Sequence, residues 1–94
     1  MATLHTNEVF NMARHLGAVP YVTNNKETAF VAETALDYLE ALFESGRYTE
    51  RLAVEVLNEK ATRLLELLNE ESGEKVDLLV DNLYEAFELF LGWD

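Results

Sequence analysis

Residues 44–79 read ESGRYTERLAVEVLNEKATRLLELLNEESGEKVDLL, and this stretch decides the fold. Between Gly46 and Gly73, apolar residues recur at spacings of three and four, which is the period of an amphipathic helix. A glycine placed where this periodicity stops commonly ends a helix in the left-handed conformation. Because only a few residues separate each glycine from the next apolar pattern, the flanking helices must fold back on the central one as antiparallel neighbours.

The glycines divide the rest of the chain in the same way and predict three longer helices, at residues 25–45, 50–71 and 74–91. Asn24, with Glu27 three residues later, resembles a capping box at the start of the first of these helices, and Thr49 is the expected cap of the second. Trp93 is expected to fold back onto the bundle. The residues expected to face the core of the last two helices are Val54, Leu57, Ala61, Leu64, Leu65, Leu68, Val76, Leu79, Val80, Leu83, Phe87 and Phe90.

The N-terminal segment predicts a shorter helix at residues 7–16, with Thr6 as its N-cap. Gly17 is expected to end that helix, and Pro20 disfavours helical backbone at Val19, so residues 17–24 are expected to form an extended connection. The inward-facing residues of the short helix would be Val9, Met12, Ala13 and Leu16. The predicted fold is therefore all-α: a single domain over residues 1–94, built as a small four-helix bundle with a short first helix.

Composition limits the class of protein. The 94 residues include no cysteine, which excludes disulfides and thiolate metal sites, and 49% of them are hydrophobic, enough to bury a core. No apolar run approaches the roughly 20 residues that cross a bilayer, and the first residues lack the pattern of a secretory signal. We expect a soluble protein of a reducing compartment, the cytoplasm.

Eighteen acidic residues against seven basic ones give a net charge of −11, and this charge is segregated along the sequence. Residues 27–46 and 76–94 each hold five acids and no Lys or Arg. Within these segments, two sets of four carboxylates fall inside arcs of about 60° and about 80° of their helices and should face solvent. We name them the first acidic row (Glu33, Asp37, Glu40 and Glu44) and the second acidic row (Asp77, Asp81, Glu85 and Glu88).

The two acidic rows differ from an ordinary solvated helix face. On the helix at 50–71, acids and bases alternate at spacings of three and four, as in Arg51, Glu55, Glu59 and Arg63, and such pairs support a helix. The rows instead place like charges next to one another, and their six neighbouring pairs should together cost roughly 1 to 3 kcal/mol. That cost is appreciable against a total stability of about 5 to 14 kcal/mol for a chain of this length.

Catalytic and metal-binding patterns are missing from the sequence. The histidines are His5 and His15; neither has a glutamate three positions before it, as a carboxylate-bridged metal site in a helical bundle would, and no nucleophile-base pattern accompanies them. The sequence has no glycine-rich phosphate loop and no HExxH zinc signature. We therefore predict no enzymatic activity, no cofactor and no metal site; an enzyme with an unrecognised carboxylate site is the least favoured alternative.

Two interpretations of the acidity remain open. The acids could serve solubility alone, or the two acidic rows could bind a basic, nucleic-acid-handling partner protein as a nucleic-acid mimic would, without binding nucleic acid or membrane directly. In size and charge the chain is similar to phage-encoded antirestriction and anti-CRISPR inhibitors, although no motif carries the likeness.

The alternative function is a helical interaction module, such as a homodimer, that uses the apolar residues Val31, Ala35, Tyr38 and Leu42. The sequence leaves open whether the two row-bearing helices are adjacent or diagonal.

Overall fold

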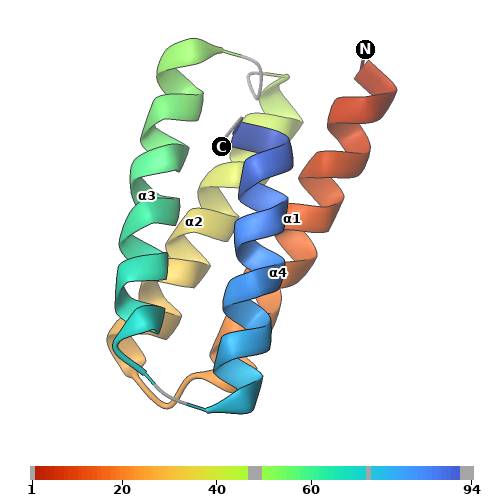
Figure 1. Cartoon of the computed structure of the whole chain (residues 1–94). Coiled ribbons are helices and arrows are strands. Elements are labelled where there is room, and N and C mark those ends of the chain that lie inside the picture. Colours follow the sequence, from red (N-terminus) through yellow and green to blue (C-terminus); the bar gives the residue numbers. More distant parts are fainter. Residues whose placement is uncertain (1, 47–49, 72, 92–94) are drawn as a thin grey trace.

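The computed structural model is an up-down-up-down bundle of four helices (Figure 1), which confirms the predicted all-α fold. The structure describes residues 2–46, 50–71 and 73–91, with side chains from residue 9 onward; Thr49 and Trp93 lie outside these residues. The predicted limits of the last three helices agree with the observed ones within two residues. The helices are α1 (Ala2–Val22), α2 (Lys26–Ser45), α3 (Arg51–Asn69) and α4 (Glu74–Leu91).

The helices follow one another around the bundle in chain order. α1 packs against α2 and α4, and α3 packs against the same two helices from the other side. Among the described residues, no Cα atom of α2 lies within 8 Å of one in α4, and the same holds for α1 and α3. These two pairs therefore lie across the diagonals of a body that measures 37 × 21 × 20 Å.

One continuous core runs through the bundle, and most of the residues predicted to face it are buried. Ala13, Val54, Val80 and Phe90 are only half-buried, whereas the sequence pattern did not identify Ala53 and Leu67, which are buried. The largest fully buried side chains come from all four helices: Met12, Leu16, Val19, Thr28, Leu39, Leu57, Leu64, Leu68, Leu83 and Phe87.

The predicted short first helix, its Thr6 cap and the extended connection at 17–24 are wrong. α1 is helical from Ala2 to Val22 and passes through Gly17 and Pro20. Pro20 lacks an N–H group, so the helix loses one hydrogen bond, but only two helical residues follow it. Val19 is fully buried in the core, and the Thr23 N–H still donates to the Val19 carbonyl at 3.0 Å. Packing on both sides of the proline therefore outweighs its local preference.

Gly17 and Gly46 show why one glycine ends a helix and another does not. Gly46 has φ of +74° and caps α2, as predicted. Gly17 has no positive φ, and a Cβ atom at that position would lie 3.9 Å from Leu36 Cδ2, an ordinary contact. Gly17 thus lies inside α1, beside α2, without interrupting the helix.

A polar cluster ties the end of α3 to the start of α2. The Thr23 hydroxyl lies 2.7 Å from both carboxylate oxygens of Glu71 and donates to them, while the Thr28 hydroxyl donates to Oε2 at 3.0 Å. Thr28 is fully buried, so Glu71 satisfies a hydroxyl that water cannot reach.

The N-cap of α2 is Asn25 and not Asn24, which the sequence suggested. The Asn25 side chain accepts hydrogen bonds from the backbone N–H groups of Glu27 and Thr28. Hydrogen bonds therefore hold the turn between α1 and α2 at both Thr23 and Asn25.

Candidate docking surface on α2

All eight carboxylate side chains of the two acidic rows are exposed to solvent, as the sequence predicts. The first acidic row lies on α2 and spans eleven residue rises, or about 16 Å. The second acidic row lies on α4 over the same number of residues. Each row is therefore a straight series of carboxylates that a partner could reach along its full length.

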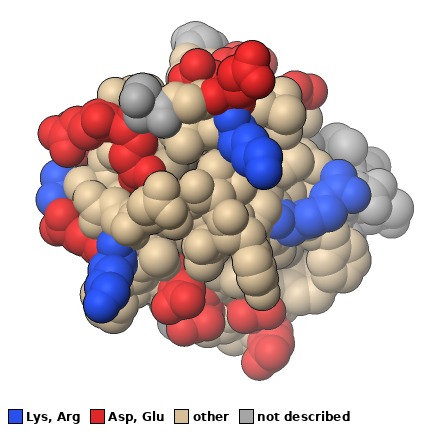
Figure 2. Space-filling model, turned by 90° about the horizontal axis from the view of Figure 1, so that it is seen from below, with Lys and Arg blue, Asp and Glu red and all other residues tan. Residues whose placement is uncertain are grey.

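The two acidic rows do not share a face, because α2 and α4 occupy diagonal positions in the bundle. Figure 2 views the end of the bundle that carries the α1–α2 and α3–α4 connections. On this end, acidic side chains gather in separate groups around the rim, with Lys and Arg side chains between them and uncharged residues in the middle. A flat partner surface can therefore meet one acidic row at a time.

The first acidic row borders the junction of α2 with α1. A cavity of about 140 Å³ opens there, and its lining contains two carboxylates of the row, Glu40 and Glu44. The rings of Phe10 and Phe43 lie 5.5 Å apart between centroids and are tilted by 54°, a favourable aromatic pair. Phe10 nevertheless leaves 59% of its surface exposed. We call this surface the α1–α2 seam; it comprises Val9, Phe10, Ala13, Leu39, Glu40, Phe43 and Glu44.

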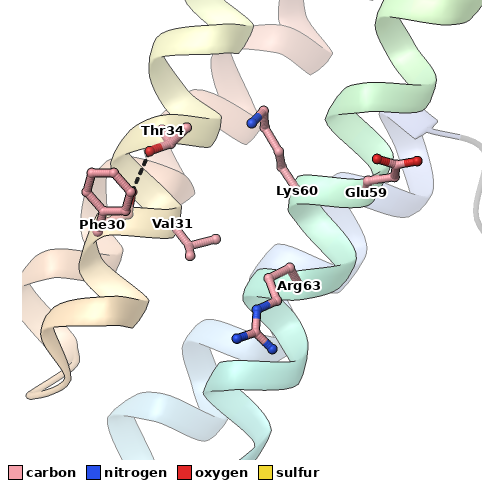
Figure 3. Close-up of a pocket in the computed structure, with 6 residues that line it drawn as sticks. All are labelled: Phe30, Val31, Thr34, Glu59, Lys60 and Arg63. Carbon is pink, nitrogen blue, oxygen red and sulfur yellow. Dashed lines mark hydrogen bonds between the residues drawn. The ribbon is translucent and has the colours of Figure 1, made fainter.

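The opposite edge of α2 forms a different surface with α3. The α2–α3 groove, lined by Phe30, Val31, Thr34, Glu59, Lys60 and Arg63, has a volume of about 300 Å³ (Figure 3). Its two cations are engaged within the protein: Lys60 Nζ lies 5.7 Å from the ring centroid of Tyr38, and Arg63 pairs with Glu27 at 3.3 Å. Figure 3 shows the Glu59 carboxylate on the side of α3 away from Phe30. These contacts tie α3 to α2 and leave no strong excess of positive charge.

The apolar arc that the sequence suggests on α2 is largely used inside the bundle. Ala35 and Leu42 are buried in the core, and Val31 and Tyr38 are half-buried residues that pack against it. The exposed apolar surface near this edge comes instead from Phe30 on α2 and from Leu52 and Val56 on α3. Leu52 and Val56 precede Lys60 at intervals of four, so they lie on the face of α3 that borders α2.

The structure also bears on the chemistry open to His15. Burial lowers its pKa below the ordinary value, the Arg14 guanidinium lowers it further, and the Glu85 carboxylate opposes both effects. The lowered pKa favours the neutral form of the imidazole. In the described part of the chain, no group of three or more His, Asp or Glu side chains is placed to hold a metal ion. Nor does any described helix combine the length and apolarity of a membrane span.

The sequence pattern did not identify Phe10, which is the most exposed apolar residue of the α1–α2 seam. Phe10 lies one position after Val9, and thus about 100° around the helix from the core-facing stripe. The sequence does identify its partner Phe43, as a core-facing residue, because Phe43 follows Leu39 by four positions on α2.

Comparisons of the chain with protein-family models, with curated proteins and with solved structures find no match.

Proposed function

We propose that this protein is a non-enzymatic, cytoplasmic binding protein that docks the first acidic row and the adjoining α1–α2 seam onto a basic partner protein. One observation carries this proposal: Glu40 and Glu44 of the first acidic row line a cavity together with an aromatic pair, and one ring of that pair, Phe10, is exposed. Acids kept only for solubility need no such neighbour. Protein interfaces, in contrast, combine an aromatic anchor with a charged rim.

The charge of the molecule supports a basic partner. A net charge of −11 attracts cationic surfaces and repels nucleic acid and anionic membranes. Basic grooves on proteins are typically built to hold nucleic acid, so the natural class of partner is a nucleic-acid-handling protein. Occupation of such a groove would exclude its nucleic acid, and the activity we propose is inhibition of the antirestriction or anti-CRISPR kind.

The diagonal arrangement of α2 and α4 restricts how such mimicry could work. Two rows on one face would imitate the two strands of a duplex, whereas rows on opposite sides of the bundle cannot meet one flat groove together. We therefore propose that the first acidic row makes the contact. The second acidic row would then contribute only to the long-range attraction.

Affinity capture at two salt concentrations tests the proposal. Tagged protein is incubated with nuclease-treated cell lysate at low salt and at raised salt, and the recovered proteins are identified by mass spectrometry. We expect basic nucleic-acid-binding proteins at low salt, their loss at raised salt because charge attraction is screened, and their release by added DNA or RNA. Recovery of no nucleic-acid-binding protein under either condition would overturn the proposal.

A second candidate function is self-association through the α2–α3 groove, and the exposure of Phe30 (66%) and Leu52 (75%) favours it. Two copies of charge −11 repel each other, so raised salt should favour the dimer, the opposite of its expected effect on a basic partner. Size-exclusion chromatography with light scattering over a range of salt and protein concentrations measures this. A monomer under all conditions would exclude the homodimer.

A further inference from the structure

We propose that the cavity of the α1–α2 seam is an anchor site for an aliphatic side chain carried by a basic amphipathic helix of the partner. The inference rests on the proposed function and specifies the partner further. Electrostatic attraction alone would require only the first acidic row. The seam adds a largely apolar site of defined size whose lining includes the exposed residues Glu40 and Glu44.

The dimensions of the seam fit an aliphatic side chain. An apolar cavity of about 150 Å³ is large enough to bind benzene, so a cavity of about 140 Å³ can accept a side chain of similar size, such as Leu or Met. Its apolar lining consists of Val9, Phe10, Ala13, Leu39 and Phe43. Because 59% of the Phe10 surface is exposed, an incoming side chain would cover an aromatic ring that is already held in place.

The charges around the seam specify what must flank that side chain. The Glu40 and Glu44 carboxylates lie one helical turn apart beside the cavity, and the rest of the first acidic row continues along α2. A partner that inserts an aliphatic side chain here must place cations beside these carboxylates. An acidic flank would repel them, and a neutral flank would remove their hydration without replacing it by an ion pair. The occupant is therefore both apolar and basic.

The shape of the seam favours a helix as the occupant. The seam lies between two packed helices, and the first acidic row extends from it along α2, for about 16 Å in all, close to three helical turns. In the described residues the protein has no strand, so no sheet edge is present to bind an extended peptide. Helix-in-groove recognition, with apolar anchors at intervals of three and four, fits these constraints.

The test uses a synthetic peptide of Leu and Lys patterned as an amphipathic helix. A scrambled peptide of the same composition keeps the charge but loses the apolar face. Binding is measured by calorimetry, and amide chemical shifts locate the peptide on the protein. We expect the patterned peptide to bind at the α1–α2 seam and the scrambled peptide to bind about tenfold more weakly. Equal binding of the two peptides would overturn the anchor.

Phe10→Ala and Phe30→Ala make a matched pair, because both rings are more than half exposed and they lie at opposite edges of α2. Circular dichroism checks that both variants keep the fold. Phe10→Ala should lower the affinity for the patterned peptide about tenfold and leave the salt dependence of binding unchanged. Phe30→Ala should bind the peptide as the unaltered protein does. If Phe10→Ala also binds as the unaltered protein does, the anchor is wrong.

A variant with Gln at all four positions of the first acidic row separates failure of the anchor from failure of the proposed function. If this variant binds the peptide more weakly and Phe10→Ala does not, the proposed function is supported and the anchor site is wrong. If Phe10→Ala weakens binding and the row variant does not, the seam is an apolar site and the electrostatic function is wrong. If neither variant has an effect, both proposals are overturned.

Discussion

Replacing Val19 by Asp is expected to remove most of the stability of the bundle. Val19 is 0% exposed and packs among the apolar residues of the core. A carboxylate at this position would leave water for apolar surroundings, which costs several kcal/mol whether it stays charged or takes up a proton. We expect a loss of at least about 4 kcal/mol, from a total of about 5 to 14 kcal/mol. Urea unfolding followed by circular dichroism measures the change.

Tyr21→Asp is the matched control for this experiment. Tyr21 lies two residues further along the last turn of α1 and is 91% exposed. The same new carboxylate would remain hydrated there, so the free energy of unfolding should change by no more than about 0.5 kcal/mol. If Val19→Asp were as mild as Tyr21→Asp, residues 17–22 would not be packed as α1 and the extended connection would be the better description.

The error at residues 17–24 has a physical cause. Pro20 and Gly17 both disfavour helical backbone locally. The sequence alone does not show whether the free energy gained by burying neighbouring residues exceeds this local cost. In the folded chain, Val19 enters the core and Thr23 donates to Glu71, which is 48 residues away in the sequence. These tertiary contacts offset the hydrogen bond lost at Pro20. Local pattern was sufficient at Gly46, where the backbone adopts the positive φ that favours glycine and a Cβ atom would meet nothing within 4 Å.

The candidate site was partly predictable. The exposure of both acidic rows follows from helical spacing, since each lies well around its helix from the core-facing stripe. Their arrangement depends on which helices are neighbours, and short connections are compatible with more than one order around a bundle. The α1–α2 seam was less predictable still, because it depends on α1 continuing alongside α2 and on Phe10 pointing away from its own core stripe.

Changing Glu33, Asp37, Glu40 and Glu44 together to Gln is expected to weaken binding of the basic partner by on the order of 10²-fold at low salt. The salt dependence of binding should flatten as well, because fewer charge contacts remain to be screened. The fold should persist and gain about 0.6 to 1.5 kcal/mol, since three repulsive pairs are removed and Gln keeps the size and helix propensity of Glu. Calorimetry over a salt series measures the binding, and urea unfolding measures the stability.

The same change at Asp77, Asp81, Glu85 and Glu88 is the control, since it also removes four negative charges and leaves the same net charge. Any loss of long-range attraction is therefore equal in the two variants, and a difference between them reports the place of contact. We expect the second-row variant to lose only a few-fold in affinity. Equal and large losses would mean that the partner contacts both sides of the bundle, as a clamp around α2 and α4 would. Full binding by both variants would show that the carboxylates serve solubility and that any partner is held by apolar surface alone.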